Sequence, residues 1–165
     1  MIVLLDEHGY LPAGFHTMDS EEIRQAFVIC FPESTTRERI YDGYLSFCDY
    51  LESCGIQSYT QMLDVSFFTS KQNPNDIDCV TFLHADQLNA LTPENQNRIQ
   101  LLFQLGFLKT NYSCDGYFCL DYPDDDPRNG MHGCGVNGRM YWRGVFGFDR
   151  LNIPKGVVIR DVIRG

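Results

Sequence analysis

Two aspartates separated by one residue are the part of this sequence best suited to chemistry. Asp76, Ile77 and Asp78 open an apolar run that we expect to form a strand. Successive side chains of a strand point to opposite faces, so both carboxylates would share one face while Ile77 enters the core. Carboxylate oxygens suit Mg²⁺, which takes one or two carboxylates together with waters and substrate phosphates. The pattern therefore predicts a metal site at the start of this strand.

A third carboxylate on a neighbouring strand would complete a site of the phosphoryl-transfer type. We expect it at Asp115, which begins a later apolar strand. Other carboxylates near the end of that strand remain alternatives, namely Asp121, Asp124, Asp125 and Asp126. An Asp-x-Asp in an acidic chain is, by itself, more often a solvated turn than a metal site. The elements around it therefore carry the argument.

Four apolar runs bounded by turn residues predict the strands that would position these carboxylates. These runs cover approximately residues 59–67, 76–83, 115–121 and 156–162. The first two are joined by a polar turn and form a hairpin, and residues 121–138 are expected to be irregular.

Three stretches of helical periodicity lie between and before these strands. These stretches cover approximately residues 19–30, 35–55 and 92–106. Thr35 and Glu38 have the spacing of a capping box, and Thr92 precedes a proline as an N-cap does. Helix, strand, turn, strand, helix, strand predicts an α/β (α+β) fold class, with a mixed sheet and flanking helices in one domain over residues 1–165.

The composition of the chain limits the kinds of partner that it is expected to bind. The 165 residues are 44% hydrophobic and include 22 acidic and 13 basic side chains, a net charge of −9. That charge argues against nucleic acid as a partner, because binding its phosphates needs a basic surface. The apolar runs are far shorter than the ~20 residues of a membrane helix, and the first residues lack the basic flank of a secretory signal. We expect a cytoplasmic protein with no membrane partner.

The hairpin resembles the signature of the nucleotidyltransferase fold, in which Gly-Ser is followed after a short turn by Asp-x-Asp. The matching segment is residues 64–78. More narrowly, the chain resembles a bacterial family of small uncharacterised nucleotidyltransferase-like proteins. That likeness extends over the Leu-Pro-Ala-Gly-Phe-His arm at 11–16, the aromatic segment at 141–150 and Pro-Lys-Gly at 154–156.

The resemblance implies a minimal nucleotidyltransferase-like fold with an extended N-terminal arm. It implies an Mg²⁺-dependent enzyme that transfers a nucleoside monophosphate from an NTP, with ATP as the expected donor, to a hydroxyl acceptor. Carried over by position, Ser66 would contact phosphate, and Asp76, Asp78 and Asp115 would be the catalytic metal ligands. Lys71, assigned only from its place in the turn, would neutralise phosphate charge. The expected partners are a nucleotide and a protein that acts as partner or acceptor.

One residue departs from the signature. Val65 stands where the signature has Gly, and a β-branched side chain obstructs close approach of phosphate to the backbone. The alternative function is therefore a catalytically degenerate binding or regulatory module of the same fold, of the toxin-antitoxin or phage-defence type.

Three further motifs are better explained as structural. Residues 133–138 match Gly-x-Gly-x-x-Gly but follow no apolar strand. Residues 124–130 resemble a calcium loop in composition but lack the closing Glu. His132 and Cys134 have no companion zinc ligands at the usual spacing.

Overall fold

The computed structural model describes residues 5–64, 66–131 and 133–163. Its strands are β1 (Gly14–Thr17), β2 (Ser58–Asp64), β3 (Ile77–His84), β4 (Cys114–Asp121) and β5 (Gly156–Ile163). Its α-helices are α1 (Ser20–Arg24), α2 (Arg37–Ser53), α3 (Ala85–Ala90), α4 (Pro93–Leu102), α5 (Phe107–Tyr112) and α6 (Gly135–Phe146). A π-helical turn (Gln25–Ile29) continues α1, and 3₁₀ turns cover Ser66–Phe68 and Pro127–Gly130.

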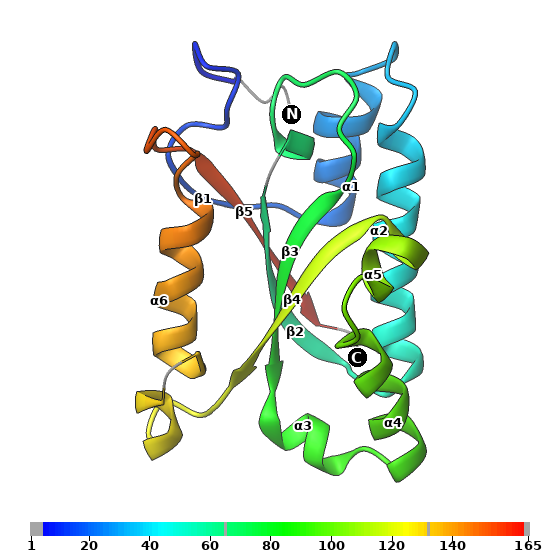
Figure 1. The fold of residues 1–165 in the computed structure, drawn as a ribbon, viewed down its shortest axis with the longest axis vertical. Helices are drawn as coiled ribbons and strands as arrows, with labels where there is room; N and C mark the ends of the chain where they lie inside the picture. The colour runs from blue at the N-terminus through cyan, green and yellow to red at the C-terminus, as the bar shows by residue number, and fades with distance from the viewer. Residues whose placement is uncertain (1–4, 65, 132, 164–165) are drawn as a thin grey trace.

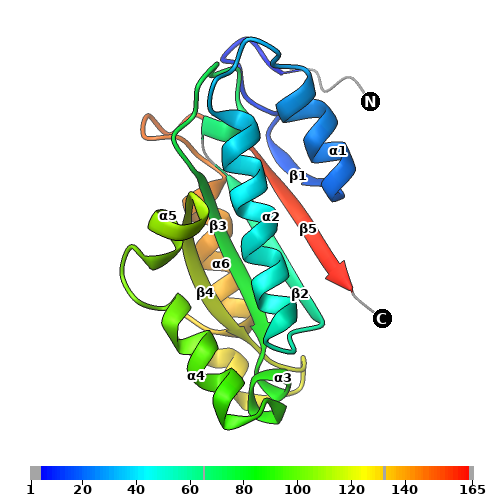
Figure 2. The same ribbon diagram turned by 90° about the vertical axis from the view of Figure 1, so that its right-hand side faces the viewer.

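The strands form one five-stranded mixed sheet in the order β1-β5-β2-β3-β4. The pairs β5/β2 and β2/β3 are antiparallel, whereas β1/β5 and β3/β4 are parallel. Helix α6 covers one face of the sheet, and α1, α2, α4 and α5 lie on the other (Figures 1 and 2). The expected α+β class with a mixed sheet is confirmed.

Helix α2 provides most of the packing on its face of the sheet. Its buried apolar residues recur every three or four positions, so they form one continuous stripe. They are Ile40, Tyr41, Tyr44, Phe47, Cys48 and Leu51. Together with the sheet and with α1, α4 and α5 they make the larger hydrophobic core.

The predicted capping box at the start of α2 is wrong. The N-cap is Thr36, whose side chain makes no capping hydrogen bond. The Oγ of Ser34 instead accepts hydrogen bonds from the backbone N–H groups of Thr36 and Arg37. Thr35 is engaged elsewhere, because its N–H donates to Asn73 in the β2–β3 connection. A tertiary contact thus overrides the local motif.

Residues 121–138 are more ordered than the sequence indicated. Helix α6 begins at Gly135, inside the glycine-rich segment, and its first turns pack closely on β4. A Cβ at Gly138 would lie 2.3 Å from the Sγ of Cys119, so only glycine permits this approach. The helix carries Trp142 and Phe146 onto a second, smaller cluster on this face of the sheet.

The N-terminal arm contributes a strand that the sequence did not indicate. Within residues expected to be merely extended, β1 pairs in parallel with β5, Gly14 facing Gly156 and Thr17 facing Ile159. The first hairpin strand is also shorter than expected, because the chain turns into 3₁₀ geometry after Asp64. None of the described helices is both long and apolar enough to span a bilayer.

Candidate active site

Three aspartates stand side by side on β2, β3 and β4, at the end of the sheet where β2 ends and β3 and β4 begin. In the antiparallel pair β2/β3, Asp64 is opposite Asp78, and in the parallel pair β3/β4, Asp78 is opposite Asp115. Neighbouring strands are ~4.8 Å apart, so Asp78 has a carboxylate on either side. The hairpin and the β3/β4 pairing therefore assemble one acidic row from three distant parts of the chain.

These carboxylates lie on the face of the sheet covered by α6. Along β3, Ile77 and Cys79 point into the larger core, whereas Val80, two residues beyond Asp78, belongs to the cluster under α6. The alternation of strand side chains places Asp78 on the same side as Val80. The expectation that Ile77 enters the core is confirmed, since its side chain is fully buried.

Asp76 joins this row from just outside the strand. It precedes β3, and its side chain is 14% exposed and adds to the negative charge around Asp78. We call Asp64, Asp76, Asp78 and Asp115 the carboxylate cluster. Burial is the main cause that raises the pKa of Asp78 to about 7, and the charges of Asp76, Asp115 and Asp64 raise it further.

Two lysines offset part of this charge. The Nζ of Lys109, on α5, lies 2.8 Å from Asp76 and 3.7 Å from Asp115. The Nζ of Lys155, in the connection from α6 to β5, lies 2.7 Å from Asp64 in a largely buried pair. Each lysine comes from a different side of the sheet, so the cluster is held from both ends. The hydrogen bond and the charge of Asp76 raise the pKa of Lys109.

The donor set has the chemistry that magnesium prefers, because it consists of carboxylate oxygens. The arrangement is less favourable. Among the residues that the structure describes, no three His, Cys, Asp or Glu side chains are already placed to hold one ion. Lys109 and Lys155 form ion pairs with the cluster, and a metal ion would have to draw the carboxylates away from them.

The two predicted phosphate-binding residues lie in the connection between β2 and β3. Ser66 begins the 3₁₀ turn, and its carbonyl accepts a hydrogen bond from Thr69. The side chain of Lys71 is exposed, and its carbonyl accepts from the buried guanidinium of Arg37. Within the described residues, neither side chain hydrogen-bonds to the cluster. Val65 and His132, on which two of the sequence interpretations depend, lie outside the described residues.

The structure distinguishes Asp115 from the alternative third carboxylates. Asp121 ends β4 in register with His84, at the opposite end of the strands from Asp78. Asp121 and Asp124 line a different pocket of about 680 Å³ beyond the ends of β3 and β4. Asp115 alone of these candidates is brought beside Asp78.

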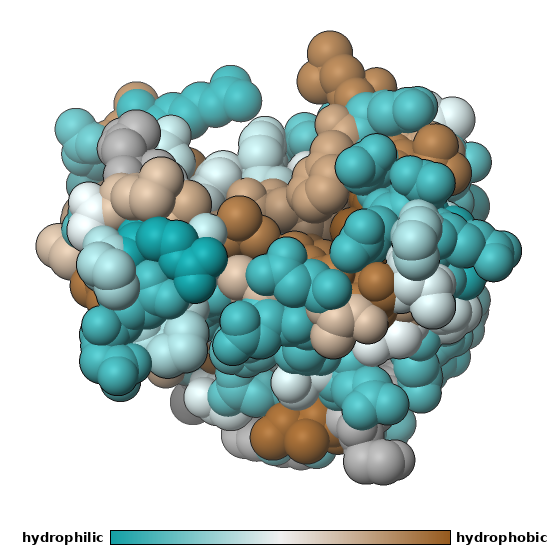
Figure 3. All heavy atoms as spheres, turned by 90° about the horizontal axis from the view of Figure 1, so that it is seen from below, coloured by the Kyte–Doolittle hydropathy of each residue, from teal (hydrophilic) through white to brown (hydrophobic). Residues whose placement is uncertain are grey.

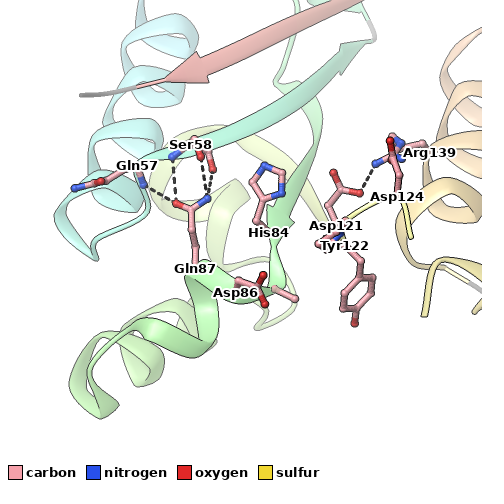
Figure 4. Close-up of a pocket in the computed structure, with 11 residues that line it drawn as sticks. Gln57, Ser58, His84, Asp86, Gln87, Asp121, Tyr122, Asp124 and Arg139 are labelled. Atoms are coloured by element: carbon pink, nitrogen blue, oxygen red, sulfur yellow. Dashed lines mark hydrogen bonds and ion pairs between the residues drawn. The ribbon is translucent and has the colours of Figure 1, made fainter. Parts of the chain in front are cut away.

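That second pocket is a competing location for a ligand, since ligands often bind beyond the carboxyl ends of parallel strands. Arg139 of α6 forms an ion pair with Asp121 there, and the ring of His84 lies between Asp121 and Gln87 (Figure 4). Seen from this end, hydrophilic side chains surround a patch of apolar atoms (Figure 3). The predicted residues of the carboxylate cluster do not line this pocket.

Sequence reasoning missed three members of the carboxylate site. Asp64 ends an apolar strand as Asp76 precedes one, and the hairpin register sets it opposite Asp78. An acidic residue within the otherwise apolar strand predicted at about 59–67 was the available signal. Lys109 and Lys155 gave no comparable signal, because their partners are set by the packing of α5 and of the α6–β5 connection.

Comparison with known proteins identifies the family. Neither the curated proteins nor the solved structures include a match to this chain. One family model matches residues 3–160, which span both strands of the hairpin, β4 and α6. The chain therefore belongs to the family described as "Family of unknown function (DUF6932)".

Proposed function

We propose that this protein is an Mg²⁺-dependent nucleotidyltransferase that transfers a nucleoside monophosphate from an NTP to a hydroxyl acceptor. The observation that carries the proposal is the row Asp64, Asp78 and Asp115, in register on three adjacent strands. Like charges crowded in a half-buried position destabilise one another, and a site of this kind gains stability when it binds a cation. The likeness of residues 64–78 to the nucleotidyltransferase signature supports the same function.

Asp76, Asp78 and Asp115 are the proposed metal ligands, and Asp64 is added because it is opposite Asp78. Bound there, magnesium would neutralise phosphate charge and lower the pKa of the attacking hydroxyl. The chain itself would hold the cluster in place. Lys155 fixes Asp64, while Lys109 contacts Asp76 and Asp115 and is exposed enough to move toward a phosphate.

A second candidate function is a binding or regulatory module of the same fold without catalysis. It is favoured by the ion pairs of Lys109 and Lys155, which satisfy carboxylates that an enzyme would keep for metal. Under this candidate, the acidic cluster and its lysines would have a structural role, and a protein partner would bind elsewhere on the surface.

Calorimetry with ATP and MgCl₂ separates the two candidates. For the enzyme we expect ATP binding that requires Mg²⁺, together with Mg²⁺-dependent release of pyrophosphate from ATP. Asp78→Asn should abolish both, because it removes the central carboxylate while keeping its shape. Asp161→Asn is the matched control, since Asp161 is an exposed aspartate on β5 whose side chain accepts from Thr60.

Two results would contradict the proposed enzymatic function. If Asp78→Asn releases pyrophosphate as the unmodified protein does, the carboxylate cluster is not the catalytic site. If the unmodified protein shows no Mg²⁺-dependent binding of any of the four NTPs, the binding-module candidate replaces the enzyme.

A further inference from the structure

A pocket other than the one beyond the ends of β3 and β4 adjoins the carboxylate cluster at the outer edge of the sheet. It has a volume of about 460 Å³ and lies between the end of α4, the turn into α5, and strand β4. Asp115 and Lys109 belong to its wall as well as to the cluster. We call it the edge pocket. Its size is within the range of small-molecule sites, and a ligand in it would reach the cluster directly.

The wall of the edge pocket presents an exposed aromatic ring. Phe103 is 52% exposed, which is unusual for a large apolar side chain that lies next to a core, whereas the ring of Tyr117 packs on Trp142 of α6, on the other face of the sheet. Phe103 makes an edge contact with Phe118, their ring centroids being 4.6 Å apart, so one side of its ring packs against β4. An exposed aromatic ring supported in this way is suited to stacking against a flat ring of a ligand.

The backbone of β4 adds hydrogen-bonding groups to the same wall. Strand β4 is the last in the sheet order, so its outer side has no neighbouring strand. The N–H of Ile77 donates to the carbonyl of Ser113, which shows that odd-numbered residues of β4 pair with β3. Alternate residues point their backbone groups the other way, so Gly116 and Phe118 direct theirs outward into the edge pocket.

From these features we infer that the edge pocket binds the nucleobase of a nucleotide whose phosphates extend past Lys109 to the carboxylate cluster. This inference rests on the proposed nucleotidyltransferase function and names the place of its substrate's base. A nucleobase is a flat heterocycle with donors and acceptors at its edge, which matches the ring of Phe103 beside outward N–H and C=O groups. Lys109 stands between the two subsites, because it lines the pocket and contacts Asp115.

The test uses nucleosides, which have a base but no phosphate and need no metal. The intact protein labelled with ¹⁵N is titrated with adenosine, guanosine, cytidine and uridine in the absence of Mg²⁺. At least one should cause saturable shifts of the amide signals of Gly106, Gly116 and Phe118. Phe103→Ala should weaken that binding about fivefold or more, as expected for the loss of one stacking partner.

Matched variants make the result specific. Phe15→Ala is the control, because Phe15 is equally exposed at 51% but lies on β1, at the opposite edge of the sheet. Phe103→Tyr keeps the ring and should bind like the unmodified protein, whereas Phe103→Leu keeps apolar bulk without the ring and should bind weakly. A spectrum with native dispersion shows that each variant is folded.

Two outcomes would overturn the inference. One is the absence of saturable shifts in this wall with any nucleoside, and the other is equal binding by Phe103→Ala and the unmodified protein. An exposed strand edge with apolar surroundings would then be better explained as a site for an added peptide strand. Nucleoside binding requires no catalysis, so it can succeed even if the unmodified protein releases no pyrophosphate from ATP and the proposed transferase activity is absent.

Discussion

Asp78 is the residue in which the conflict between burial and charge is greatest. Its carboxyl is partly buried and has acidic neighbours on both adjacent strands. In the unfolded chain the same carboxyl titrates near 4, whereas in the folded protein its pKa is raised to about 7. The folded state therefore binds this proton more tightly than the unfolded state does.

The sign of the resulting pH dependence follows from linkage. Between about pH 4 and pH 7 the folded state holds more protons, so this group makes the free energy of unfolding fall as pH rises. Above about pH 7 the carboxyl of Asp78 is ionised in both the folded and the unfolded state, so this loss of stability does not increase further. We expect Asp78→Asn to be more stable than the unmodified protein at pH 8 by about 2 kcal/mol, after allowance for solvent screening, and by much less at pH 5.

Urea unfolding at the two pH values, without added metal, measures this difference. Asp161→Asn serves as the control and should show no comparable gain. A loss of stability in Asp78→Asn at pH 8 would mean that the carboxylate makes a favourable native contact that outweighs its repulsion.

At the scale of elements, Arg37 is the main connection between helix α2 and the segment that carries Ser66 and Lys71. Its guanidinium is fully buried and donates to the backbone carbonyls of Phe27, Phe67, Thr69 and Lys71. It also lies 3.8 Å from the centre of the Phe31 ring. Burial lowers its pKa to about 10, which still leaves it charged near neutral pH.

Removing this side chain should therefore cost far more than removing an ordinary surface arginine. We expect Arg37→Met to lower the free energy of unfolding by about 3 kcal/mol or more, because several buried carbonyls lose their donor. Arg39→Met, on the same helix, removes an exposed side chain bonded to Ser113 and should change it by only about 0.5 kcal/mol. Equal midpoints for the two variants in urea would refute the structural role of Arg37.

Several elements were predictable because local patterns specify them. Strands β3, β4 and β5 are apolar runs between turn residues, and α4 has the predicted N-cap Thr92, whose Oγ accepts a hydrogen bond from the N–H of Asn95. The two carboxylates Asp78 and Asp115 could be proposed as neighbours because each begins such a run. Here the local pattern and the tertiary structure agree.

The elements that were missed depend on contacts between distant residues. Helix α6 begins in a glycine-rich segment with low helix propensity, and its position depends on the fit of Gly138 against Cys119. Strand β1 is short and exists through its pairing with β5. Asp64 became part of the site only through the hairpin register, which the sequence of one strand does not specify.

At the scale of the whole molecule, the sheet joins two hydrophobic clusters of unequal size. On the α2 side, a buried polar network adds to the packing: Tyr44 donates to Gln61, Gln61 donates to Thr81, and Arg160 donates to Tyr44. These residues belong to α2, β2, β3 and β5, so the network links the helix layer to the three central strands. A fully satisfied buried network favours one arrangement of these elements.

Because the two clusters share strands, we expect the sheet and both helix layers to unfold together. Met62 and Val80 pack under α6, and their chain neighbours Leu63 and Cys79 pack under α2, so neither layer can separate without disturbing the other. Trp142, the single tryptophan, reports on the α6 layer, while circular dichroism at 222 nm reports mainly on the helices of the other face.

The two signals should have the same urea midpoint in the unmodified protein. Phe146→Ala truncates a buried ring of α6 and Phe47→Ala a buried ring of α2, and each should destabilise the protein by about 3–5 kcal/mol. In both variants the fluorescence and dichroism midpoints should move together. A shift of the Trp142 signal alone in Phe146→Ala would show that the α6 layer, which covers the carboxylate cluster, opens independently of the sheet.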